Sequence, residues 1–112
     1  MDPAKPDIFI SDLVVSTAGR DQGMLYYCVG NDGRFVMLAN GKDRTLEKPK
    51  RKSLRHVRKV LRSETRVAQK LSSGDKVLNS ELRRDLAFHA DQMQSIDLLG
   101  GYQLGKRRRN RD

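Results

Sequence analysis

The sequence predicts a mainly β-structured domain, a small curved or closed antiparallel barrel, followed by one or two short helices and a disordered basic tail. Between residues 13 and 47, short apolar, β-branched and aromatic runs are separated by breaks containing Gly and Asp, which is typical of consecutive strands. From about residue 60 the apolar residues recur roughly every four positions, the period of a helix. A chain of 112 residues accommodates one small domain with a modest core.

Five strands are expected, near residues 13–17, 24–30, 34–39, 44–47 and 53–57. The segment Asn31-Asp32-Gly33 is a strong hairpin signal, because Asp-Gly readily adopts the positive φ angles of tight turns. Asn40–Asp43 is a second turn signal. Closing or curving the sheet would protect its edge strands, which is why a barrel is the natural architecture.

The first expected helix lies in the segment SETRVAQKLSSG. Ser63 is a candidate N-cap, and Val67 and Leu71 are four residues apart on one face. Gly74 is a stop signal, because glycine readily adopts the left-handed conformation that ends many helices.

A longer amphipathic helix is expected to begin at Asn79 or Ser80. Its apolar face would comprise Leu82, Leu86, Ala90 and Met93. The predicted organisation is a flexible N-terminus (1–8), a barrel (9–60), a helical extension (61–95) and a disordered basic tail (96–112).

Positive charge is concentrated in two blocks. Residues 42–70 carry twelve basic and three acidic side chains, a net charge of +9, and residues 106–112 carry five and one, a net charge of +4. The segments 1–41 and 71–105 are slightly acidic, at −2 each. Concentrated positive potential attracts polyanions over about 8–10 Å at physiological salt. Nucleic acid is the commonest partner of this kind.

The first block contains the segment EKPKRKSLRHVRK, residues 47–59, in which apolar residues interrupt the basic ones. Leu54, Val57, Val60 and Leu61 could anchor it to the barrel. Lys50, Lys52, Arg55 and Arg58 would then point outward from a folded surface. Residues 53–61 could be a strand running into a helix or one helical turn throughout, and Pro49 favours an extended approach. The alternative is a solvated face that attracts polyanions without specificity.

The segment LVVSTAGRDQGMLYYCVG resembles the KOW motif, in which two apolar strands flank Gly, a basic residue, Asp, a variable position and Gly. Gly19, Arg20, Asp21 and Gly23 match this pattern. The later segments RFVMLANG and EKPKRKSLRHV are also similar to bacterial KOW-domain RNA-binding proteins, which are related to KOW-bearing large-subunit ribosomal proteins. The resemblance covers residues 9–60 and extends more weakly to about residue 90. Gln22 stands where the family usually has a second basic residue.

The resemblance implies an SH3-like (KOW-type) barrel and binding to ribosomal or another structured RNA, in translation or ribosome assembly. The turn glycines would be Gly19 and Gly23, and Asp21 is expected to cap the turn. Tyr26, Tyr27 and Phe35 could present a ring to an unpaired base or pack in the core. The expected RNA-binding residues are Arg20, Lys48, Lys50, Arg51, Lys52, Arg55, His56, Arg58, Lys59, Lys106, Arg107, Arg108 and Arg109.

No catalytic function is expected, because the sequence pairs no nucleophile with a base and sets no carboxylates together. The two histidines, His56 and His89, lie in different elements without a second cysteine, so neither a metal site nor a cofactor is expected. Cys28 lies among apolar residues and should be a buried thiol. The lack of a leader-like or membrane-spanning segment favours a cytoplasmic protein without a membrane or small-molecule partner.

Two functional classes remain open. The first is an RNA-binding module, with ribosomal proteins as further candidate partners. The second is a protein-binding adaptor that docks on the transcription or translation machinery through the barrel loops or the helix around Leu82–Met93. The basic tail should add reach and affinity for RNA but little selectivity, because a Gly-rich spacer separates it from the domain.

Overall fold

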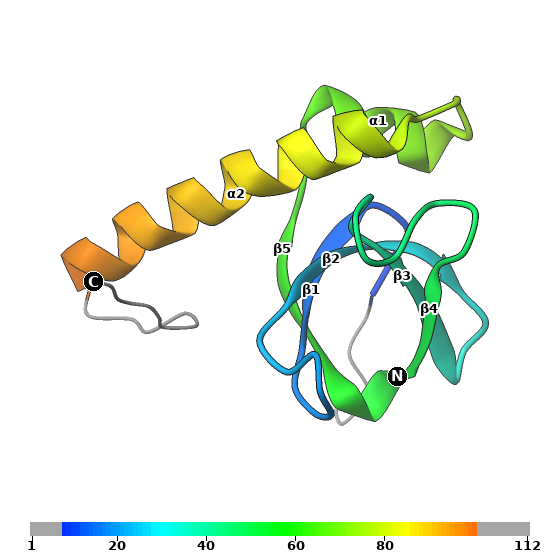
Figure 1. Ribbon diagram of the computed structural model, residues 1–112, viewed down its shortest axis with the longest axis horizontal. Helices are drawn as coiled ribbons and strands as arrows, with labels where there is room; N and C mark the ends of the chain where they lie inside the picture. Colours follow the sequence, from blue (N-terminus) through cyan, green and yellow to red (C-terminus); the bar gives the residue numbers. More distant parts are fainter. Residues whose placement is uncertain (1–7, 101–112) are drawn as a thin grey trace.

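The computed structural model describes residues 8–100, which form a five-stranded antiparallel sheet followed by two helices (Figure 1). The helices lie along one side of the sheet, and the far half of the second one extends beyond it (Figure 1). The elements are β1 (Asp12–Ser16), β2 (Leu25–Asn31), β3 (Phe35–Ala39), β4 (Lys50–Ser53), the 3-10 turn η1 (Leu54–His56), β5 (Val57–Arg62), α1 (Arg66–Ser73) and α2 (Asn79–Gly100).

The strand order is β4-β3-β2-β1-β5, so the two outermost strands are consecutive in sequence. Only the short turn η1 joins them, which forces the sheet to curve until its two edges meet at that end (Figure 1). Leu54 N donates to Arg34 O (3.0 Å) and Thr17 N donates to His56 O (2.9 Å), so η1 is tied to both sides of the sheet. No ladder joins β4 to β5 among the described strands, and the sheet is therefore curved but not closed.

The three central strands are buried on both faces. Val14, Tyr26 and Val36 belong to a cluster on the face away from the helices, together with Cys28, Leu38, Val57 and Ile8. Leu13, Tyr27 and Ala39 alternate with them and pack against Ala68, Leu82 and Leu86 of the helices. Burial on both faces explains why the strand sequences are continuous apolar runs rather than alternating ones.

The expected strand at 44–47 is wrong, because residues 40–49 form a loop. Its backbone donors bond within the loop or to α2 instead of to a neighbouring strand. Asn40 N and Gly41 N both donate to Arg44 O at 2.9 Å. The Asn40 Oδ1 atom accepts from Lys42 N and Arg44 N at 3.0 Å each, and Asn79 Oδ1, at the start of α2, accepts from Leu46 N at 2.9 Å. The fourth strand consequently begins later, at Lys50.

The segment 53–61 differs from both alternatives. A helical turn comes first, at Leu54–His56, and the strand follows. Ser53 caps the turn through its Oγ atom, which accepts from Arg55 N. The apolar residues do anchor the segment: Val57 is buried, Leu54 packs on the first core cluster, and Val60 and Leu61 pack on the second.

The helices begin and end close to the expected positions. Thr65, not Ser63, is the N-cap of α1, and Gly74 ends it in the left-handed conformation at φ 84°. In α2, Leu82, Leu86 and Met93 are buried as expected, and Ala90 is half-buried.

Two expected boundaries shift. Helix α2 continues to Gly100, so residues 96–100 belong to it and not to the tail. Ile8, expected in the flexible N-terminus, is buried in the core.

Gly41 should be required where the loop after β3 meets α2. Its φ is +76°, and a Cβ atom would collide with the carbonyl oxygen of Asn79 and lie 3.2 Å from Arg83 N. Gly33 has a similar φ of +97° but open space around it. We expect Gly33→Ala to lower the free energy of unfolding by about 1–2 kcal/mol, the cost of a left-handed conformation. Gly41→Ala should cost more, because the collision adds to the same backbone penalty.

Urea unfolding of both variants measures this difference. Equal destabilisation would contradict the collision between the Gly41 position and α2.

Candidate nucleic-acid interface

The loop between β1 and β2 is a tight, internally bonded turn. Gly19 and Gly23 have φ angles of +87° and +90°, which only glycine adopts without strain. Gly23 N donates to Ser16 O (2.8 Å) and Gln22 N donates to Gly19 O (3.2 Å). The two glycines are thus explained by the backbone turn, which holds Arg20 at an exposed tip.

Asp21 organises this loop from a buried position. Its carboxylate accepts hydrogen bonds from Ser16 Oγ (2.8 Å), Tyr26 OH (2.8 Å) and Lys52 Nζ (2.7 Å). Burial alone would raise the pKa of Asp21, but the bonds from Lys52, Ser16 and Tyr26 outweigh it and lower that pKa well below its ordinary value. Asp21 therefore stays ionised and links the loop to β2 and β4, a broader role than capping the turn.

Lys52 was expected to point outward, and the structure corrects this. The side chain is buried, with 9% of its surface exposed, and its ammonium also donates to Ala18 O at 2.7 Å. Alternation along β4 puts Lys50 on the same face, where its Nζ lies 3.4 Å from Asp21 Oδ2 and its side chain is 24% exposed. Lys52 is therefore an anchor of the first loop, and Lys50 is half-exposed beside it.

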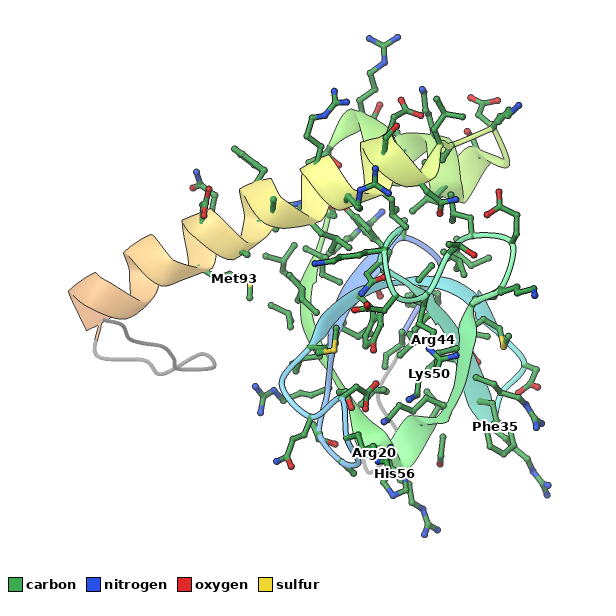
Figure 2. The ribbon with its side chains drawn as sticks, viewed as in Figure 1. Arg20, Phe35, Arg44, Lys50, His56 and Met93 are labelled. Carbon is green, nitrogen blue, oxygen red and sulfur yellow. The ribbon has the colours of Figure 1, made fainter. Side chains whose placement is uncertain are left out.

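Six of the expected RNA-binding residues are exposed, and we call them the basic surface: Arg20, Lys48, Arg51, Arg55, His56 and Arg58. They come from the β1–β2 loop and from the segment 48–58. Figure 2 shows Arg20 and His56 at the same end of the sheet, where the bond from Thr17 N to His56 O joins the loop to η1. Arg20 and His56, which are 36 positions apart in sequence, thus share one exposed end of the molecule.

Other expected residues are placed differently. Lys59 is half-buried, and its Nζ lies 3.1 Å from Asp12 Oδ2. Lys106, Arg107, Arg108 and Arg109 lie outside the described residues.

Arg44 is a further candidate, which is absent from the expected RNA-binding residues. It is exposed in the loop before β4. Burial and the bond to Asp21 raise the pKa of Tyr26, whereas the nearby charge of Arg44 opposes that rise. Its membership of the +9 block was the available signal, but the expected strand at 44–47 obscured its position.

The three candidate aromatic rings differ in their exposure to solvent. Tyr26 and Tyr27 are 1% and 0% exposed, so both rings belong to the core. Phe35 is half-buried, and the Arg51 guanidinium carbon lies 3.8 Å from its ring centroid. Phe35 is therefore the only one of the three with an accessible ring.

A second buried polar cluster joins the helices to the sheet. Tyr27 OH donates to the Asp85 carboxylate, and Thr65 Oγ1 donates to the same carboxylate at 3.1 Å. Ser63 Oγ and Asp85 Oδ2 both approach the Nε2 atom of His89, at 3.1 and 3.4 Å. In a hydrolase triad the serine contacts one ring nitrogen of the histidine and the acid contacts the other. Here Ser63 and Asp85 both lie at Nε2, so the cluster does not have the geometry of a triad. Burial, with the bond to Asp85, raises the pKa of Tyr27 to about 12.

The burial of Cys28 makes its thiol unreactive. Cys28 is buried as expected, and burial raises the pKa of its thiol to about 11. At neutral pH it therefore remains a protonated side chain of the core.

No protein-family model and no curated protein sequence matches this chain. Among the side chains that the structure describes, those of residues 8–93, no group of three or more His, Cys, Asp or Glu is placed to hold a metal ion. None of the described helices combines the length and apolarity needed to cross a membrane.

Lys52 and Lys50 should differ in their effect on stability. Lys52→Met removes the closest partner of a buried carboxylate, which typically costs about 3–5 kcal/mol. Lys50→Met removes a longer and more exposed ion pair, worth about 0–1 kcal/mol. Urea unfolding of the two variants tests this, and a similar loss in both would mean that Lys52 is not the anchor.

Asp21 should make the protein sensitive to acid. Its folded pKa lies below the unfolded value of about 3.9, so its contribution is complete above that value and is lost as the pH falls toward the folded pKa. The wild type should therefore lose stability on acidification that Asp21→Asn, already less stable at pH 7, does not lose. Thermal unfolding between pH 7 and pH 2 measures this, and parallel curves would contradict it.

Proposed function

We propose that the barrel-like part of the chain is an SH3-like, KOW-type module that binds structured RNA through the basic surface. Ribosomal RNA is the expected class, in translation or ribosome assembly, and the role is binding without catalysis. Support for the KOW-type assignment comes from the Gly-Arg-Asp-Gln-Gly loop in the first hairpin. The curved five-stranded sheet, whose last two strands are joined by η1, is compatible with an SH3-like barrel.

The observation that carries the proposal is the fixed position of Arg20 beside η1. The bonds from Lys52 Nζ to Ala18 O and from Thr17 N to His56 O hold the loop against the β4–η1–β5 segment. The charges of Arg20 and Arg55, and the ring of His56, are thus presented together from a rigid scaffold. A rigid array loses less conformational entropy on binding than a flexible basic tail.

The chemistry of the basic surface suits a polyanion. Lys and Arg neutralise phosphates and release counterions, which supplies affinity, while the shape of a folded RNA supplies most of the selectivity. Arginine is especially suited to phosphate, because its planar guanidinium can donate two parallel hydrogen bonds.

The rival function, a protein-binding adaptor, would use the barrel loops or the side of α2 that faces away from the sheet. Leu82 and Leu86 of α2 are already buried against the sheet. Phe88, on the same helix, is 52% exposed and offers an apolar contact. An adaptor using this side of α2 would bind its partner with weak dependence on salt, in contrast to an RNA-binding surface.

The salt dependence of RNA affinity tests the proposal. Six phosphate contacts predict a slope of log affinity against log salt of roughly −4 to −5. These contacts would come from the exposed or half-exposed cations Arg20, Arg44, Lys48, Lys50, Arg55 and Arg58. Replacing Arg20, Lys48 and Arg55 by Ala should flatten this slope by roughly 2–3 units. It should change stability by within about 0.5 kcal/mol per site, because all three side chains are exposed. Lys52 is left in place because it anchors the fold.

The matched control replaces Arg66, Lys76 and Arg84, which are exposed on the helical side, and removes the same charge. Its slope should remain near that of the wild type. If the two triple variants behaved alike, the basic surface would not be the site. An absence of binding to any structured RNA at low salt would overturn the proposed function.

A further inference from the structure

Arg51 has surroundings unlike those of the other members of the basic surface. It lies on β4, opposite Met37 of β3, and its guanidinium carbon is 3.8 Å from the ring centroid of Phe35 two residues along β3. Alternation places it on the opposite face of β4 from Lys50 and Lys52. Arg51 and Phe35 thus form a pair on the side of the sheet edge away from the Asp21 cluster.

The surface beside Arg51 and Phe35 is apolar and carries few side chains. Phe35 and Met37 are both half-buried on the same face of β3. Gly30 of β2 pairs with Met37, and a Cβ atom on Gly30 would lie 3.2 Å from Met37 Cγ. The strand beside Met37 therefore contributes no side chain at this point, and Arg51 rests on an apolar platform.

The local charge is mixed and not purely positive. Asp32, in the β2–β3 turn, accepts from Phe35 N at 2.9 Å and from Arg34 N at 3.0 Å. These backbone bonds, and then the charge of Arg51, lower the pKa of Asp32, so a carboxylate stands near the guanidinium at neutral pH. A carboxylate disfavours a phosphate at this position, whereas a neutral flat group is unaffected.

We propose that Phe35 and Arg51 form a stacking site for one unpaired nucleobase of the bound RNA. Aromatic rings and guanidinium planes are the groups on which proteins stack splayed bases, whereas the bases of a duplex remain stacked on one another. The inference rests on the proposed function and deepens it: the preferred RNA contains an unpaired loop or bulge next to the phosphates bound by the basic surface.

The location allows one RNA to use both sites. Leu54 N donates to Arg34 O, so the β2–β3 turn beside Phe35 is bonded directly to η1, which carries Arg55 and His56. Figure 2 shows Phe35 and His56 in the same lower part of the sheet. A strand whose phosphates lie on η1 therefore has Phe35 and Arg51 as its neighbours.

The experiment compares an RNA hairpin carrying 2-aminopurine in its unpaired loop with a fully paired duplex of equal length. Phe35→Leu removes the ring and keeps an apolar side chain; Arg51→Lys keeps the charge and removes the planar group. Each should weaken binding of the hairpin by about tenfold and abolish the quenching of 2-aminopurine fluorescence. The affinity for the duplex should stay within twofold of the wild type. The salt slope for both RNAs should be unchanged, because no phosphate contact is removed.

Arg84→Lys, the same chemical change at an exposed position on α2, is the matched control and should behave as the wild type. Thermal unfolding of each variant separates loss of the site from loss of the fold, and Arg51→Lys is the decisive variant if Phe35→Leu destabilises. Normal hairpin binding and quenching in Arg51→Lys would overturn the stacking site while leaving the proposed function intact. Failure of the wild type to bind either RNA would overturn both.

Discussion

The buried ion pair between Asp21 and Lys52 is the constraint on which the arrangement of the molecule depends. It joins a loop near the beginning of the chain to a strand 31 residues later, at 2.7 Å. Ser16 and Tyr26 complete the coordination of the carboxylate, so the pair is hydrogen-bonded on several sides. A buried pair contributes little net stability by itself, because desolvation offsets much of the attraction. Its effect here is positional: the β1–β2 loop can occupy only the place that leaves Asp21 against Lys52.

Because of this ion pair, some residues of the basic segment 48–58 anchor the fold and others are exposed. Alternation along β4 turns Lys50 and Lys52 toward Asp21 and Arg51 to the other face. The 3-10 turn then reverses the chain, which leaves Arg55 and His56 exposed beside the loop that carries Arg20. A run of similar basic residues therefore has three different environments: buried and paired, stacked on an aromatic ring, and free of the core at the end of the sheet.

The helices are held by a different kind of contact. Leu82 and Leu86 bury the outer face of the sheet, and the carboxylate of Asp85, between them in sequence, binds Tyr27 OH and Thr65 Oγ1. Hydrogen bonds to a buried carboxylate are directional, so they select one orientation of α2 where apolar packing alone would allow several. The helices are thereby kept at the opposite end of the sheet from η1, which carries Arg55 and His56 (Figure 1).

The sequence by itself determined the class of fold, the first hairpins, the residues that end α1 and begin α2, and the burial of Cys28, because these depend on local periodicity and turn chemistry. Its apolar spacing also showed that the segment 47–59 is folded. Only the tertiary structure decided that residues 40–49 are a loop, because the backbone donor of Leu46, within the expected strand, bonds to the side chain of Asn79 far along the chain. It likewise decided which lysine is buried. Lys50, Arg51 and Lys52 are all long basic side chains and differ only in the partner that folding places beside each.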